Sequence, residues 1–133
     1  MKTLKNKIAL VAFSIAVALT SCTTEDLNFD KRDDYTGNWI CQESSSQLGT
    51  SSYNVSITKS TTDSTAILIS NFYNLGFSKS AKAIVSGNSL TLNAQLVDNL
   101  NVAGSGVLSG THINMTYTVS AGGTDNVTAV YSK

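Results

Sequence analysis

The chain has 133 residues, which is enough for at most one ordinary domain. Its nine basic and nine acidic residues balance, so the sequence carries no electrostatic footprint for nucleic acid. Hydrophobic residues make up 41% and charged residues 14% of the chain, a composition that allows a packed core and excludes a coiled coil or a disordered acidic tail.

The N-terminal segment has the pattern of an export signal. Three lysines within the first seven residues precede a mostly apolar run over residues 8–19. That run has 12 residues, whereas a helix that spans a membrane needs about 20. A basic start followed by a short apolar run indicates a signal peptide, which we place at residues 1–21.

The residues around Cys22 resemble the lipobox of bacterial lipoproteins, because Leu19 stands three positions before the cysteine and the small Ser21 directly before it. The resemblance implies that diacylglycerol is attached to the Cys22 thiol and that cleavage frees its amine for a further acyl chain. Two or more acyl chains anchor a protein stably, whereas one chain binds only marginally. The sequence therefore predicts the membrane as a partner through a lipid anchor on Cys22. Plain secretion with an ordinary thiol is the alternative.

An acidic, flexible tether is predicted over residues 22–34, because this segment is rich in charge and cannot pack a core. Its acidic pair Glu25-Asp26 resembles the export signal of Bacteroidota surface lipoproteins. The resemblance implies the outer membrane and the cell surface; a solvated linker on the periplasmic face is the alternative. Cleavage removes three lysines and no acid, so the mature chain has six basic and nine acidic residues. Its net charge of −3 gives no attraction to nucleic acid.

From Tyr35 onward, apolar and polar residues alternate with a period of two. Such alternation indicates antiparallel strands with one buried and one solvated face. Turn signals such as Gly87-Asn88 separate the runs, and polar loops are predicted over residues 44–51 and 59–64. The predicted strands are eight: 37–43, 52–58, 65–71, 81–86, 89–96, 101–109, 112–119 and 126–132.

Short connections between successive strands favour a meander, and eight strands can close into a barrel that has no exposed edge. Gly104 and Gly106 share one face of a strand, where glycine often marks a barrel bend or a close approach. The sequence therefore predicts an all-β domain over residues 35–133, an eight-stranded antiparallel up-and-down barrel. A two-sheet β-sandwich is the alternative.

The sequence Gly37-Asn38-Trp39 at the start of the first strand resembles the Gly-x-Trp signature of lipocalins and other calycins. The later pattern resembles small lipocalin-like lipoproteins of Bacteroidota, and it comprises Asn71-Phe72, Gly87-Asn88, Gln95, Gly104-x-Gly106 and Tyr117. The resemblance covers residues 35–133. It implies a lipocalin-like barrel that serves as a binding or structural module, with Gly37 and Trp39 as its structural signature and without catalytic residues.

Residues that could carry chemistry are scattered along the chain. His112 is the only histidine and opens a strand after a turn, a position typical of a solvent-facing residue. Cys41 remains once Cys22 is acylated, and it is predicted to be a buried, inert thiol. Because no local cluster of histidine, cysteine and carboxylate residues stands out, we predict no enzyme activity, no metal site and no cofactor.

One short motif points to a modification. Asp63-Ser64-Thr65 resembles the three-residue acceptor of the Bacteroidota O-glycosylation system. It lies at the junction of a loop and a strand, where a glycan has room. The resemblance implies Ser64 as an O-glycosylation site.

An aromatic loop over residues 71–77 is the most unusual segment. It places Phe72, Tyr73, Leu75 and Phe77 in one connection, whereas most loops are polar. The loop either folds inward and plugs one end of the barrel, which we favour, or lines the mouth of a pocket or a partner surface. In the second case Phe72, Tyr73 and Phe77 are the candidate contacts for a ligand or partner.

These observations favour a lipid-anchored, surface-exposed, non-enzymatic β-barrel module of the outer membrane. It is expected to bind a small apolar ligand or a protein partner. The alternative is a structural accessory subunit of an outer-membrane assembly, with a filled barrel and no ligand.

Overall fold

The computed structural model describes residues 29–133. The chain divides into two compact units after Asp30, and the second unit, Lys31–Lys133, contains all the helices and strands of the described residues. The predicted signal peptide, Cys22 and the Glu25-Asp26 pair lie outside the described residues. Within residues 29–133, no helix has the length and apolar character that crossing a membrane requires.

Eight strands and two short 3₁₀ helices form the second unit. In chain order they are η1 (Lys31–Asp34), β1 (Gly37–Ser45), β2 (Gly49–Lys59), β3 (Ala66–Ser70), η2 (Phe72–Asn74), β4 (Ser80–Ser86), β5 (Ser89–Val97), β6 (Leu100–Ser109), β7 (His112–Ser120) and β8 (Thr124–Ser132).

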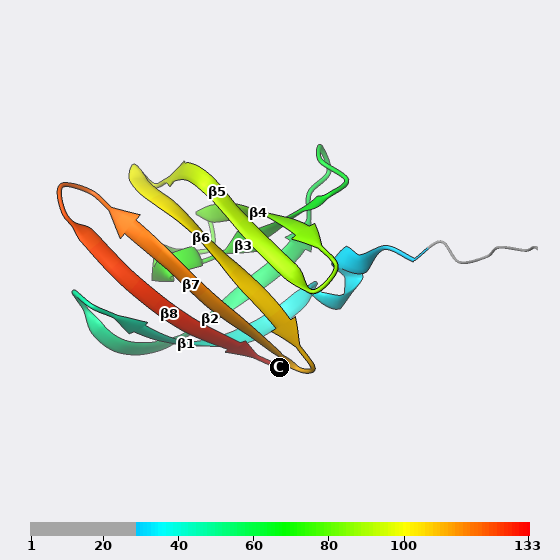
Figure 1. The fold of residues 1–133 in the computed structure, drawn as a ribbon, viewed down its shortest axis with the longest axis horizontal. Helices are drawn as coiled ribbons and strands as arrows, with labels where there is room; N and C mark the ends of the chain where they lie inside the picture. Colours follow the sequence, from blue (N-terminus) through cyan, green and yellow to red (C-terminus); the bar gives the residue numbers. More distant parts are fainter. Residues whose placement is uncertain (1–28) are drawn as a thin grey trace, which may run out of the picture. The chain divides into compact units, whose positions relative to one another are not determined.

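The strands close into one antiparallel barrel in sequence order, from β1 to β8 (Figure 1). β8 returns to pair with β1, from Ile40 opposite Ser132 to Ser45 opposite Val127. The predicted up-and-down barrel is confirmed. The sandwich is excluded, because each described strand has a neighbour on both sides and no sheet edge remains.

Alternating burial along the strands creates a single core inside the barrel. Every second residue of β1 and β8 is buried, as the period of two requires. The continuous apolar run at residues 66–69, whose inward face the sequence leaves open, places Ile67 and Ile69 in the core. Most of the polar residues between the buried ones face outward, which explains how a chain rich in serine and threonine forms a compact barrel.

The connection between β1 and β2 is shorter than predicted. The sequence predicts a polar loop over residues 44–51, but β1 continues to Ser45 and β2 begins at Gly49. The Ser45 hydroxyl accepts hydrogen bonds from the backbone N–H groups of Gln47 (3.2 Å) and Leu48 (2.8 Å). These bonds stabilise a tight turn, so the serines extend the strands instead of forming a loop.

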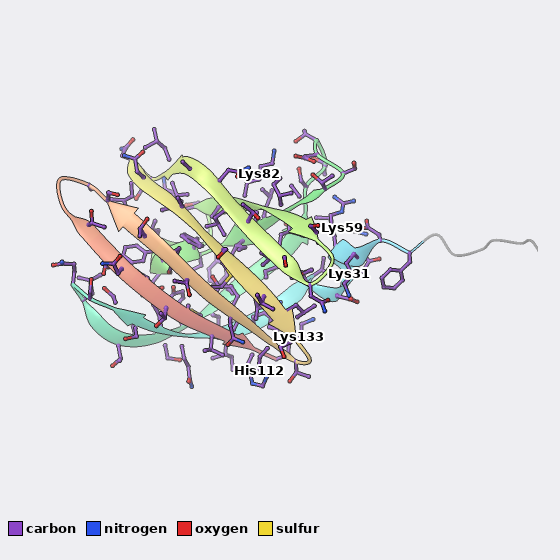
Figure 2. The ribbon with its side chains drawn as sticks, in the orientation of Figure 1. Lys31, Lys59, Lys82, His112 and Lys133 are labelled. Carbon is purple, nitrogen blue, oxygen red and sulfur yellow. The ribbon has the colours of Figure 1, made fainter. Side chains whose placement is uncertain are left out.

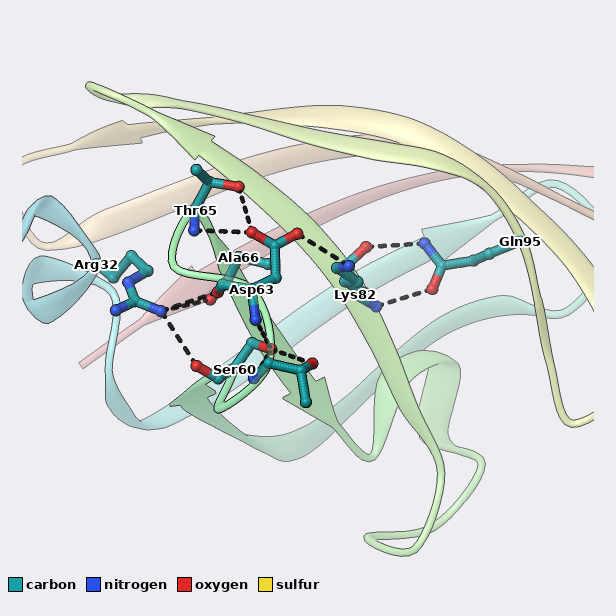
Figure 3. A network of polar contacts seen from close by, with 8 residues as sticks. Arg32, Ser60, Asp63, Thr65, Ala66, Lys82 and Gln95 are labelled. Carbon is teal, nitrogen blue, oxygen red and sulfur yellow. Dashed lines mark hydrogen bonds and ion pairs between the residues drawn. The ribbon is translucent and has the colours of Figure 1, made fainter.

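The predicted tether ends earlier than residue 34, because Lys31–Asp34 form η1 within the barrel unit. The Arg32 guanidinium donates to the backbone carbonyls of Ser60, Asp63 and Ala66, each at 3.2 Å (Figure 3). The Tyr35 hydroxyl donates to the Gly87 carbonyl at 2.9 Å. These contacts fix the first residues of the barrel unit to the rest of the barrel. The local sequence does not reveal them, because the partners lie about 30 to 50 residues further along the chain.

Two glycines of β6 allow side chains of β7 to lie across the barrel interior. A Cβ atom at Gly104 would lie 2.4 Å from the Tyr117 Cβ, and one at Gly106 would lie 2.3 Å from the Met115 sulfur. A larger residue at Gly104 would collide with the backbone of β7, and one at Gly106 would displace the Met115 side chain. The close approach that the sequence predicts at this glycine pair is therefore confirmed.

Between β4 and β5, a side chain takes the place of a backbone hydrogen-bond partner. β5 is irregular between Leu92 and Gln95, and its direct pairing with β4 covers only Ile84 to Ser86. The Gln95 side chain accepts from the Lys82 backbone N–H and donates to the Lys82 carbonyl, both at 2.8 Å (Figure 3). Its amide thus replaces the backbone of a neighbouring strand at this point of the wall.

The barrel has two different ends. The η1 end carries η1, the β2–β3 loop, the β4–β5 and β6–β7 turns and the C-terminus; Figure 2 shows Lys31, Lys59, His112 and Lys133 toward it. The η2 end carries the β1–β2 turn, the loop with η2, and the β5–β6 and β7–β8 turns. The chain enters the barrel unit at the η1 end.

Candidate functional site

The aromatic loop occupies the η2 end and has an unusual backbone. Asn71, Tyr73 and Asn74 have φ values of 62°, 56° and 56°, in the left-handed region. Asparagine tolerates this region, but a bulky tyrosine rarely adopts it. Such strain persists only where the surroundings hold it, and it is concentrated at functional sites.

The Asn71 side chain holds the loop in place. Its amide nitrogen donates to the Asn54 carbonyl on β2 at 2.7 Å, and its amide oxygen accepts from the Gly76 backbone N–H at 2.7 Å. The loop is therefore attached to the barrel wall at its base and closed across its own turn.

The three aromatic residues of the loop have different surroundings. Phe72 is fully buried, with its ring centroid 4.7 Å from that of Tyr117 on β7. Tyr73 is half-buried and meets Tyr117 edge-on at 6.4 Å. Phe77 is 59% exposed. Phe72 thus fills the barrel end as the plug interpretation requires, whereas Phe77 does not.

A buried carboxylate connects this loop to two neighbouring turns. Asp125, at the start of β8, accepts hydrogen bonds from the hydroxyls of Ser45 (2.5 Å), Ser46 (2.9 Å) and Tyr73 (2.5 Å). It also accepts from the Gln47 backbone N–H at 3.1 Å. Burial alone would raise the pKa of Asp125, but these donors outweigh it and lower the pKa to about 2. Burial and the bond to Asp125 raise the pKa of Tyr73 to about 12.

A pocket opens beside this network at the η2 end. Its volume is about 270 Å³, and Leu48, Tyr73, Leu100, Val119, Thr124 and Asp125 contribute to its lining. Most of these side chains are apolar, and the Tyr73–Asp125 pair supplies a few fixed polar atoms. That combination is typical of sites for small ligands, and the volume lies just below their usual range of about 300–1,000 Å³.

Large apolar side chains are also exposed at the same end. Leu48, Phe77 and Leu96 are 73%, 59% and 66% exposed. The charges of Lys79 and Asp98 nearby neutralise each other in an ion pair of 3.1 Å. The η2 end is therefore more apolar than the η1 end.

The barrel interior contains an acidic residue that the sequence reading missed. Glu43 is only 5% exposed, and the hydroxyls of Tyr53 and Tyr117 both donate to its Oε2, the first at 2.5 Å. The alternation gave a signal, because Glu43 lies two and four residues after Cys41 and Trp39 and must share their inward face. Burial is the largest cause that raises the pKa of both tyrosines.

Cys41 and Tyr131 lie next to this cluster. Cys41 is a buried free thiol opposite Tyr53 on β2 and Tyr131 on β8, and burial raises its pKa to about 12. The predicted burial of this free thiol is confirmed, and its inertness stays a prediction. The Tyr131 hydroxyl is fully buried and has no hydrogen-bond partner among the described residues.

The Gly-x-Trp residues close the η1 end. Trp39 is 2% exposed, and its indole N–H donates to the Tyr35 carbonyl at 2.8 Å. The Lys133 ammonium lies 4.5 Å from the Trp39 ring centroid and donates to the Thr36 carbonyl at 2.9 Å. Gly37 has a φ of +121°, which favours glycine there.

The remaining predicted residues lie elsewhere on the barrel. Ser64 is exposed in the β2–β3 loop, where Asp63 Oδ1 accepts bonds from the Thr65 N–H (2.9 Å) and hydroxyl (2.6 Å). These bonds lower the pKa of Asp63. His112 is exposed at the start of β7. Glycosylation of Ser64 stays a prediction.

Among residues 29–133, no three His, Cys, Asp or Glu side chains come together as a metal site would require. The arrangement at the η2 end offers shape, apolar surface and fixed hydrogen-bonding groups. Its chemistry therefore suits binding.

Comparison with known proteins supports the fold. No protein-family model and no curated protein matches the sequence. Among solved structures, a redesigned β barrel, b11L5F_LGL, matches with a TM-score of 0.57 and 13% identity, over 80% of this chain and 96% of that chain. EF1p2_mFAP2b bound to DFHBI matches with a TM-score of 0.57 and 12% identity, over 79% of this chain and 99% of that chain. At such identities the similarity shows the barrel fold alone.

Proposed function

We propose that the protein is a lipid-anchored, non-enzymatic binding module of the outer membrane, similar to the small lipocalin-like lipoproteins of Bacteroidota. It faces the cell surface and binds a small, mostly apolar ligand at the η2 end. The observation that carries the proposal is the pocket at this end, where apolar side chains surround the Tyr73–Asp125 pair. A barrel match bound to DFHBI is consistent with ligand binding by this architecture.

The point at which the chain enters the barrel unit supports the η2 end as the binding end. Lys31, the first residue of the barrel unit, is only nine positions after Cys22. At about 3.4 Å per residue, an anchor on Cys22 would keep the η1 end within roughly 30 Å of the membrane. The η2 end is the opposite end of the barrel, so its apolar surface and pocket would be accessible from solvent.

Exposed apolar side chains favour a second candidate function, the binding of a protein partner. Leu48, Phe77 and Leu96 are each more than half exposed at the η2 end. The third candidate, a structural accessory subunit, draws support from the core, because the inward side chains are almost fully buried. The experiment below distinguishes the three.

Native ligand capture tests the proposed function. The full chain is expressed in a Bacteroidota host and purified gently from outer membranes, and bound molecules are identified by mass spectrometry. We expect fatty-acid labelling of the wild type, surface protease sensitivity and a retained small molecule. Cys22→Ala should lose the label and the membrane association. Leu48→Ser should reduce ligand recovery, because Leu48 lines the pocket and is too exposed to support the core.

Val107→Ser is the matched control, because Val107 is 52% exposed on the outer wall away from the pocket. It should leave ligand recovery unchanged. Recovery of a protein instead of a small molecule, with the same dependence on Leu48, would favour the partner function. Recovery of neither would favour the structural subunit, and equal labelling of Cys22→Ala would remove the lipid anchor from the proposal.

A further inference from the structure

Glu43 is a buried carboxyl group that takes part in no ion pair within the described part of the chain. Its carboxyl group is almost fully buried, and both tyrosine hydroxyls that bond to it donate to the same oxygen. Among residues 29–133, no lysine, arginine or histidine forms an ion pair with it. Buried charges are normally paired, because removing a carboxylate from water costs several kcal/mol in real proteins.

A second polar group in the barrel interior lacks a hydrogen-bond partner among the described residues. The Tyr131 hydroxyl is fully buried without a hydrogen-bond partner among the described residues. Tyr131 and Tyr53 flank Cys41 in one row across β8, β1 and β2, and Glu43 follows Cys41 on the inward face of β1. A buried hydroxyl without a partner, next to a buried carboxyl group that has hydroxyl donors but no cation, indicates that the cluster lacks a further polar or charged group.

The walls of this cluster are aromatic. Tyr53, Tyr117 and Tyr131 lie around Glu43 in the core, and the Phe72 ring packs against Tyr117 in a tilted arrangement, with 4.7 Å between the ring centroids. Aromatic faces attract cations, and they do so more strongly where water is excluded. The carboxyl group meets the hydroxyls of Tyr53 and Tyr117, so an organic cation would gain its main attraction from Glu43 and a further one from any ring face that it reaches. A metal ion is disfavoured, because the described residues bring no three metal-ligating side chains together.

We propose that the barrel interior beneath the η2 loop binds a small organic ammonium ion, with Glu43 as its counter-charge and the Tyr131 hydroxyl as a further polar contact. The inference rests on the proposed binding function and adds an interior site with its own ligand class, because neither Glu43 nor Tyr131 lines the η2 pocket. An aromatic or aliphatic body on the ammonium ion would take the space that Phe72 fills.

Access to this site requires the η2 loop to move. Phe72 covers Tyr117, and the hydroxyl of Tyr73 holds the loop to Asp125 at 2.5 Å. The left-handed backbone at Tyr73 is strained, so the closed loop depends on such contacts. A site that is open only part of the time binds with an apparent affinity reduced by the open fraction. Weakening the Tyr73–Asp125 contact should therefore tighten binding.

Titration calorimetry with matched probes tests the proposal on the full chain in detergent micelles. The probes are 2-phenylethylammonium and the neutral 2-phenylethanol, which share an aromatic body and differ in charge. We expect saturable binding of the ammonium probe, and binding of the alcohol that is weaker by about tenfold or more, the ratio that one modest charge interaction produces. Tyr73→Phe should bind the ammonium probe more tightly than the wild type.

Three further variants locate the site. Glu43→Gln should weaken ammonium binding by about tenfold or more. Tyr131→Phe should weaken it by a smaller factor and leave the unliganded fold intact, because the removed hydroxyl has no partner among the described residues. Asp98→Asn removes a surface carboxylate at the same barrel end and should bind as the wild type does, which controls for partition of the probe into micelles.

Equal affinities for the two probes would overturn the proposal, as would unchanged binding by Glu43→Gln. If Glu43→Gln does not fold, unchanged binding by Tyr131→Phe and by Tyr73→Phe overturns it. Absence of binding by both the wild type and Tyr73→Phe also overturns it and leaves an internal water as the partner of Tyr131. Such a failure combined with recovery of a neutral native ligand would remove only the ammonium class and retain the binding module.

Discussion

Cys41 lies inside the barrel between two tyrosines on neighbouring strands, and its surroundings determine its chemistry. Burial raises the pKa of its thiol to about 12, a hydrogen bond with Tyr53 lowers it in part, and the nearby Glu43 raises it again. Because the thiolate is the reactive form of cysteine, we expect this thiol to be unreactive at neutral pH.

Thiol alkylation tests this conclusion. In the Cys22→Ala full chain, Cys41 is the only thiol. We expect iodoacetamide to leave the folded protein unmodified at about pH 8 and to modify it fully in denaturing urea. Control labelling of a small thiol under both conditions confirms that the reagent is active. Rapid modification of the folded protein would show that the interior opens to solvent far more readily than its burial indicates.

At the residue scale, the alternation that places the predicted buried Cys41 on the inward face also places Glu43 and Ser45 there. A glutamate in a strand is normally interpreted as an outward residue, because burial of a carboxylate is costly. Its tyrosine partners come from β2 and β7, up to 74 residues away, so no local pattern revealed them.

At the scale of elements, the aromatic loop contains one buried and one exposed phenylalanine within six residues. Phe72 is buried against Tyr117, whereas Phe77 is 59% exposed. Truncation of a buried phenylalanine removes packed surface and leaves a cavity, but truncation of an exposed one does neither. The two residues therefore form an internal pair for comparison.

Urea unfolding of two alanine variants measures this difference. We expect Phe72→Ala to lower the free energy of unfolding by about 3–5 kcal/mol and Phe77→Ala to change it by less than about 0.5 kcal/mol. The m-values should stay unchanged, so that the shift in midpoint reports stability. Equal losses in the two variants would contradict the placement of Phe77, and a neutral Phe72→Ala would contradict the plug.

The connecting segments were predicted less well than the strands. The charged residues 31–34 looked like a continuation of the tether, but η1 packs on the barrel because Arg32 bonds to carbonyls of a loop about 30 residues away. The serines near residue 45 looked like a loop, but they bond to Asp125 across the barrel end. Strand positions follow from local alternation, whereas these segments depend on contacts made only after the barrel closes.

At the scale of the whole molecule, the sequence predicts the closure of the barrel but not the cluster of polar groups inside it. Eight alternating runs with short connections already pointed to a meander that closes on itself. The sequence could not show that carboxyl and phenol groups share the interior, because their contacts join β1, β2 and β7. The same closure places all five tyrosines of the chain in surroundings that disfavour the phenolate.

A spectrophotometric titration tests the barrel as one cooperative unit. Burial is the largest cause that raises the pKa of every tyrosine, to about 12 for Tyr35 and Tyr73 and further for the other three. A free tyrosine titrates near pH 10, so the raised values mean that the neutral phenols stabilise the folded state. That stability is complete below about pH 10 and is lost as the pH rises toward 12 and beyond.

We therefore expect little phenolate absorbance at about pH 10.5, followed by a single steep rise in which all the tyrosines ionise as the barrel unfolds. Protein in denaturing urea is the control, and its tyrosines should titrate gradually around pH 10. The emission of Trp39, the only tryptophan, should shift to the red in the same step, because its ring becomes solvated when the η1 end opens. Ionisation of several tyrosines near pH 10 with unchanged Trp39 emission would mean that solvent reaches the phenols in the folded protein, and the closed interior would then be wrong.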